Sequence, residues 1–159
     1  MSWKTCYSIG ELLVAAEEAA RTCTAISFDL FDTLLIRRTH DPDLVKPATA
    51  RFIAEKLAAL GRVVSWEEVQ DLRDRAEREQ REATGRRFAD QEARYPDFMT
   101  QLLRQLFPGQ DVTALLAEVT GYELDMEAAM LVPRAGLVEW LRRMHASGRK
   151  ILVLSDVYL

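Results

Sequence analysis

Few cysteines and the lack of any long apolar run narrow the classes to which this 159-residue sequence can belong. Cys6 and Cys23 are too few for a disulfide-dense small protein. They do not stand at C-x-x-C spacing, so we expect two small buried side chains in a reducing compartment. No run approaches the roughly 18 apolar residues that a membrane-spanning helix needs, and we expect no membrane partner.

The sequence also lacks an excess of positive charge. It has 21 basic and 25 acidic residues, and its net charge is −4. A nucleic-acid-binding protein usually carries a basic excess or stripe, so we expect no nucleic-acid partner. Glu11, Glu17 and Glu18 interrupt the apolar residues near the N-terminus, which is incompatible with a secretory signal. We therefore expect a cytoplasmic protein.

Apolar periodicity predicts two short strands and several helices. Residues 24–29 and 150–155 form short apolar runs of the kind found in buried strands, and Leu34–Ile36 continues the first run. Ser8 and Ser65 each precede a glutamate by three residues, a spacing that predicts capping boxes and helix starts. Pro133 and Gly148 bracket a further predicted helix over about residues 134–147.

The order of these elements predicts an α/β fold. A long connection between two apolar strands favours parallel pairing, which needs a crossover. The helical patterns between them cover roughly 90 residues, far more than a crossover requires, and they predict an inserted helical subdomain. Residues 71–82 alternate in charge at i,i+4 spacing, which predicts a solvated helix face.

Polar residues follow both predicted strands. Asp29, Asp32 and Thr33 follow the first strand, and Ser155 and Asp156 follow the second. In α/β sheets, ligands bind beyond the carboxyl ends of the strands. Parallel pairing would therefore bring these two groups of residues together at one edge of the sheet.

At these positions the sequence resembles the haloacid dehalogenase-like (HAD) superfamily. ISFDLFDTLLIR is similar to its first motif, a hydrophobic strand followed by D-x-D-x-T or a close variant. KILVLSDVYL, which Pro133-x-x-Gly136 precedes, is similar to its second motif, a strand followed by Ser or Thr. The predicted helical region lies where that superfamily inserts its type-1 cap.

The resemblance implies a Rossmann-like HAD core with an inserted α-helical cap. Residues 1–37 would form the first part of the core, residues 38–130 the cap, and residues 131–159 a core helix and second strand. We expect a fragment of a longer protein, inactive by itself, because the family's lysine and further acidic metal ligands would lie beyond Leu159. The two motifs together are also similar to a narrower group of HAD hydrolases, some of which occur with glycosyltransferase modules, and this implies such a module as a partner.

The resemblance implies a hydrolase that is a Mg²⁺-dependent phosphatase of a small phosphorylated metabolite. Asp29 would be the nucleophile and form an aspartyl-phosphate, because a carboxylate can split phosphoryl transfer into two steps. Mg²⁺ prefers oxygen ligands, and the implied protein ligands are the Asp29 carboxylate and the Phe31 main-chain carbonyl. The resemblance assigns phosphate or substrate binding to Thr33, Arg37, Ser155 and Asp156. For Thr33 a hydrogen bond to the loop backbone is favoured over one to the substrate, and Arg37 equally suits a solvated loop position.

One position departs from the phosphatase pattern. Where those enzymes have a second aspartate as general acid and base, this sequence has Phe31, and Asp32 follows where many members have glycine. Proton transfer of this kind contributes about 10²–10⁴-fold. Either Asp32 or a cap residue supplies the proton, or the reaction needs none, as in metal-independent dehalogenases, or the domain is a non-catalytic HAD-like module beside a glycosyltransferase.

Overall fold

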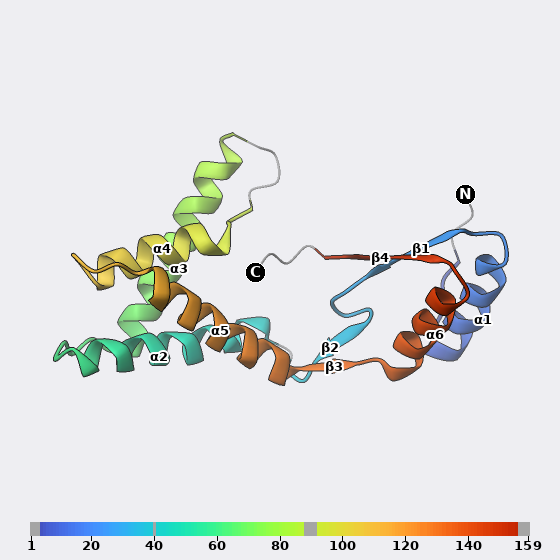
Figure 1. The fold of residues 1–159 in the computed structure, drawn as a ribbon, viewed down its shortest axis with the longest axis horizontal. Coiled ribbons are helices and arrows are strands. Elements are labelled where there is room, and N and C mark those ends of the chain that lie inside the picture. Colours follow the sequence, from blue (N-terminus) through green and yellow to red (C-terminus); the bar gives the residue numbers. More distant parts are fainter. Residues whose placement is uncertain (1–3, 40, 88–91, 156–159) are drawn as a thin grey trace. The chain divides into compact units, whose positions relative to one another are not determined.

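The computed structural model describes residues 4–39, 41–87 and 92–155 (Figure 1). Two compact units make up the chain. One combines Met1–Arg38 with Leu131–Asp156, and the other is built from Thr39–Met130. The first unit holds the described strands and the second is helical, so the protein is of mixed α/β composition.

A parallel pair of strands organises the first unit (Figure 1). Strand β1 (Ala25–Asp29) pairs with β4 (Lys150–Leu154) along its whole length, which confirms the predicted parallel pairing. Helix α1 (Ile9–Ala20) precedes β1, and helix α6 (Ala135–Ala146) precedes β4. The order helix–strand in both halves follows from the apolar spacing of the sequence, since strands of β-branched residues alternate with amphipathic helices.

The core of this unit lies between the two helices and the strand pair. Trp140 is 2% exposed, and its ring lies 6.0 Å from that of Phe28 on β1. The Trp140 Nε1–H donates to Glu17 on α1 at 2.6 Å, so the indole's polar atom is satisfied. The other buried members of this core are Ala20, Leu34, Leu137, Leu141 and Met144. Burying such side chains removes apolar surface from water, and this ties α1 and α6 to the strands.

A second, small sheet in this unit was not predicted. Strand β2 (Leu35–Arg37) pairs antiparallel with β3 (Leu131–Pro133). The apolar residues 34–36 do not extend β1, because the backbone N–H groups of Leu34 and Leu35 both donate to the Leu30 carbonyl and turn the chain. Three-residue strands are too short for an alternating pattern to be recognised.

The cysteines and the first helix allow two further comparisons with the sequence. The Ser8 Oγ accepts from the Glu11 N–H at 3.1 Å, which confirms the predicted start of α1. The expectation of two buried cysteines is wrong for Cys23, which is exposed in the turn between α1 and β1, while Cys6 is half-buried. Within the part of the chain that the structure describes, no helix combines the length and the apolar character needed to cross a bilayer.

The described part of the second unit consists of helices packed around one apolar core. The Ser65 Oγ accepts from the Glu68 N–H at 3.1 Å and confirms the predicted start of its longest helix. Pro47, which we expect to kink or split its helix, lies in a first turn, where its missing N–H leaves no bond broken. The elements are η1 (Pro42–Leu44), α2 (Val45–Ala59), α3 (Trp66–Gly85), α4 (Tyr95–Leu106) and α5 (Thr113–Met130).

A buried ionic cluster joins α3, α4 and α5. Arg73 is 3% exposed, so the expectation that residues 71–82 form a solvated face is wrong at this position. Its Nη2 donates to Glu123 Oε1 at 2.5 Å, and the Tyr95 hydroxyl donates to Glu123 Oε2 at 3.1 Å. Burial and then the negative charge of Glu123 raise the pKa of Tyr95, so its hydroxyl stays protonated and remains a donor.

Candidate functional site

The two strand ends singled out by the sequence lie next to each other in the first unit. Asp29, the last residue of β1, is in register with Leu154, the last residue of β4. The Leu30 N–H donates to the Leu154 carbonyl at 2.9 Å and extends the ladder one step further. Ser155 follows directly in the chain, so the loop after Asp29 and the start of the segment after β4 occupy the same edge of the sheet. The predicted Asp156 lies outside the described residues.

The Asp29 carboxylate is exposed, and one of its oxygens accepts a hydrogen bond. The Thr33 Oγ1 donates to Asp29 Oδ2 at 2.9 Å. Thr33 therefore bonds the side chain of the last β1 residue, whereas the sequence favoured a bond to the loop backbone over one to a substrate. This bond orients one carboxylate oxygen, and the exposed side chain leaves the carboxylate accessible, an arrangement that suits an attacking oxygen of defined orientation.

The backbone after Asp29 makes a tight turn. Leu34 and Leu35 both donate to the Leu30 carbonyl at 2.9 Å. Asp32, exposed within this turn, has φ +56°, in the left-handed region that glycine adopts freely and that aspartate enters more readily than most residues. The backbone conformation of this turn is therefore compatible with aspartate at position 32.

Arg134 donates two hydrogen bonds to carbonyl groups of this turn, and the sequence did not single it out as a site residue. Its Nη2 donates to the Asp32 carbonyl at 3.3 Å, and its backbone N–H donates to the Leu34 carbonyl at 2.8 Å. Arg134 lies between β3 and α6, about one hundred residues from the turn. Strand β3, which places Arg134 there, is too short to be recognised from its own pattern, so the sequence carried no signal for this position.

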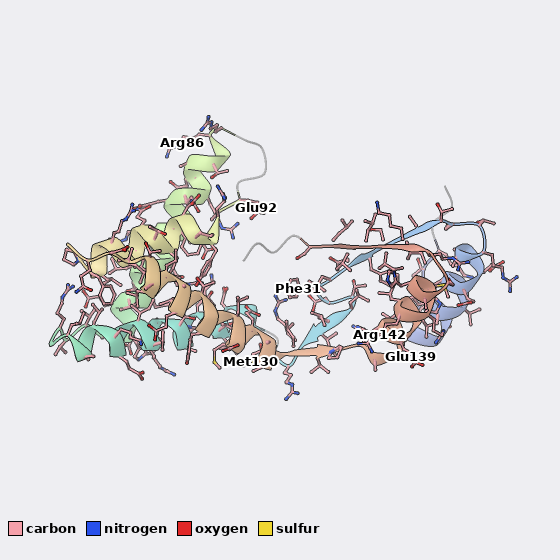
Figure 2. All side chains as sticks on the ribbon, in the orientation of Figure 1. Phe31, Arg86, Glu92, Met130, Glu139 and Arg142 are labelled. Atoms are coloured by element: carbon pink, nitrogen blue, oxygen red, sulfur yellow. The ribbon has the colours of Figure 1, made fainter. Side chains whose placement is uncertain are left out.

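Phe31 and Arg37 form a cation–π contact beside the turn. The Arg37 guanidinium carbon lies 4.6 Å from the centroid of the Phe31 ring, and both residues are half-buried. Phe31 lies on the loop between β1 and β2 (Figure 2). Arg37 is part of β2 rather than of a solvated loop, and its Nε is buried without a hydrogen-bond partner among the described residues. The aromatic ring thus holds a positive charge beside the turn that follows Asp29.

The oxygens at this strand end suit a magnesium ion in kind. The Asp29 carboxylate and a main-chain carbonyl are hard oxygen ligands, and Mg²⁺ usually takes one or two protein carboxylates and keeps several waters. Within the ranges that the structure describes, no group of three or more His, Cys, Asp or Glu side chains gathers to hold a metal. The donors at this strand end are compatible with an ion that keeps several waters in its coordination shell.

Comparison with known proteins adds no family to these observations: no protein-family model matches the chain, and neither does any curated protein.

Proposed function

We propose that this chain carries the nucleophile part of a HAD-like hydrolase, a Mg²⁺-dependent phosphatase of a small phosphorylated metabolite. The observation that carries the proposal is the register of β1 and β4, which sets Asp29 beside the residue that precedes Ser155. A carboxylate at a strand end, oriented by the Thr33 hydroxyl and close to a second strand's serine, has the parts that phosphoryl transfer requires: a nucleophile and donors for phosphoryl oxygens.

In the proposed reaction the free oxygen of Asp29 attacks phosphorus, and the bond between phosphorus and the ester oxygen breaks. The alcohol leaves with a proton, and an acyl-phosphate remains on Asp29. Water then attacks that phosphorus, which releases inorganic phosphate and restores the carboxylate. The hydrogen bond from Thr33 to Oδ2 of Asp29 would orient the carboxylate so that Oδ1 attacks.

The Asp29 carboxylate and the Phe31 main-chain carbonyl would hold Mg²⁺. When bound, the ion would neutralise negative charge on the phosphoryl oxygens. Asp32 is the nearest carboxylate along the turn that could give the leaving group its proton, and its exposed side chain is free to move toward it.

A second candidate is a HAD-like module without catalysis that accompanies a glycosyltransferase. Phe31 favours it, because phenylalanine stands where related phosphatases carry their proton-transferring aspartate and cannot replace it. A dehalogenase-type hydrolase without metal is the remaining alternative, since its chemistry also dispenses with the second aspartate.

One experiment separates these functions. The full-length natural protein is incubated with a panel of phosphate esters with and without Mg²⁺, and released phosphate is measured. We expect Mg²⁺-dependent release that Asp29→Asn abolishes, and an acid-stable ³²P label on the wild type alone. Asp125→Asn, at an exposed position of α5, is the matched control and should retain activity.

Three results would contradict the phosphatase proposal. Activity that survives Asp29→Asn would exclude the aspartyl-phosphate. Metal-independent hydrolysis of 2-haloacids, lost in Asp29→Asn, would indicate the dehalogenase alternative. Inactivity toward both substrate classes would favour the non-catalytic module.

A further inference from the structure

A cavity of about 410 Å³ lies within the first unit, against the turn that follows Asp29. Thr33 lines it and also bonds the Asp29 carboxylate, so the cavity adjoins the candidate nucleophile. Its size is within the range of small-molecule sites, which run to roughly 300–1,000 Å³. The lining comes from the N-terminal segment, the turn and the start of α6, and comprises Lys4, Cys6, Tyr7, Ser8, Ile9, Leu12, Asp32, Thr33, Arg134 and Leu137.

The charges in this lining favour an anion. Lys4 and Arg134 reach it from separate segments of the chain, and Asp32 is the one carboxylate among the described lining residues. Arg134 has five N–H donors, of which one donates to the Asp32 carbonyl, so the others remain for a ligand. Glu11, which lines a neighbouring hollow, already accepts the Tyr7 N–H at 2.8 Å.

The cavity lining combines apolar side chains with a few charged and polar ones, as small-molecule sites usually do. The half-buried side chains of Ile9 and Leu12 contribute apolar surface to the lining. A small ligand here would place its carbon skeleton on these side chains and its charged end toward Lys4 and Arg134. The guanidinium suits carboxylate and phosphate groups, because its planar donors match their oxygens.

From this arrangement we infer that the cavity is a subsite for a second anionic group of the substrate, a carboxylate or a phosphate remote from the phosphoryl group that Asp29 attacks. The substrate class is then a phosphorylated small acid or a bisphosphate. The inference depends on the proposed function for the position of the substrate, while the recognition of the second anion belongs to Lys4 and Arg134. Lys4 lies outside the sequence motifs, and Arg134 occupies an unspecified position of Pro133-x-x-Gly136.

Binding to the Asp29→Asn form of the full-length natural protein tests the subsite without turnover. Calorimetry with Mg²⁺ compares 3-phosphoglycerate with glycerol 3-phosphate, which differ by a carboxylate in place of a hydroxymethyl group. Fructose 1,6-bisphosphate and fructose 6-phosphate test a phosphate in the same role. We expect the member with the second anion to bind about tenfold more tightly in at least one pair, as a charged hydrogen bond provides.

Variants then assign the preference to the cavity. Lys4→Gln and Arg134→Gln should each bring the ratio of the two dissociation constants toward one, and Arg134→Lys should recover part of it. Lys150→Gln on β4 and Arg142→Gln on α6 (Figure 2) are matched controls, exposed and outside the lining, and should leave the ratio at its wild-type value.

The outcomes distinguish this inference from the proposed function. Equal binding of both members in both pairs overturns the subsite, and so does a preference that the control variants reduce as strongly as Lys4→Gln. A preference that depends on Lys4 and Arg134 supports it even if the wild type hydrolyses no ester, a result that would refute the phosphatase alone. Absence of binding by all four esters overturns the subsite.

Discussion

Replacing Glu123 by glutamine removes one charge from the most deeply buried ionic contact in the helical unit. The Arg73 and Glu123 side chains are 3% and 6% exposed, and their atoms Nη2 and Oε1 lie 2.5 Å apart. At an effective dielectric constant of about 20, opposite charges about 4 Å apart attract by about 4 kcal/mol. The variant loses this attraction and leaves Arg73 without its main partner.

Part of the loss is offset by groups that remain. Glu77 Oε2 lies 3.8 Å from Arg73 Nη1 and continues to balance its charge. A glutamine carbonyl at position 123 can still accept from the Tyr95 hydroxyl. We therefore expect the free energy of unfolding to fall by about 3 kcal/mol, at the lower end of the range for broken buried pairs.

Urea unfolding followed by circular dichroism measures this change. With a denaturant slope of about 2 kcal/mol per molar, the midpoint should fall by about 1.5 M. Hydrogen exchange of the α3 and α5 amides assigns the loss to the helical unit. Glu118→Gln, on the same helix and paired with Lys56 at the surface, is the matched control and should change stability by less than about 1 kcal/mol.

A double variant tests the reasoning further. Arg73→Met with Glu123→Leu removes both charges, so no unpaired charge remains buried, and it should be more stable than Glu123→Gln. A loss below about 1 kcal/mol for Glu123→Gln would refute the claim that this pair is desolvated. A double variant that is less stable than Glu123→Gln would refute the claim that the unpaired charge causes the loss.

Three further predictions concern acid stability, a helix end and the turn. Burial opposes ionisation of Glu77, but the charge of Lys46 and a hydrogen bond from Arg81 outweigh it and lower the pKa of Glu77 below 4.5. The ionised Glu77 therefore stabilises the fold above about pH 4.5, and this contribution is lost on acidification. Glu77→Gln should make the free energy of unfolding depend less on pH in the acid range, and an unchanged dependence would contradict this. Gly148 has φ +88°, so Gly148→Ala should lower the free energy of unfolding by about 1 kcal/mol. Gly136 lies inside α6, and the nearest atom to an added Cβ would be 3.8 Å away, so Gly136→Ala should raise the free energy of unfolding. Equal effects of the two variants in thermal unfolding would contradict the conformational argument. Asp32→Asn keeps the left-handed turn and should reduce phosphatase activity by about 10²-fold or more if Asp32 transfers the proton, and unchanged kcat would exclude that role.

Local features of the sequence decided where most elements begin and how the first and last strands pair. Ser8 and Ser65 cap helices because a side-chain oxygen three residues before a backbone N–H can satisfy it without help from the rest of the fold. The parallel pairing of residues 25–29 with 150–154 followed from two apolar runs and a long crossover. The positions of Asp29 and Ser155 at one sheet edge follow from that pairing alone.

The tertiary structure decided what depends on partners distant in sequence. Arg73 can be buried because Glu123, 50 residues later in the sequence on α5, pairs with its charge. The charge spacing within α3 does not indicate this partner. The three-residue strands β2 and β3 exist only as a pair, since each is too short to be recognised by its own pattern. The cavity beside the turn needs Lys4 and Arg134 at once, and only the packing of α1 and α6 on the strands brings these two cations to the same place.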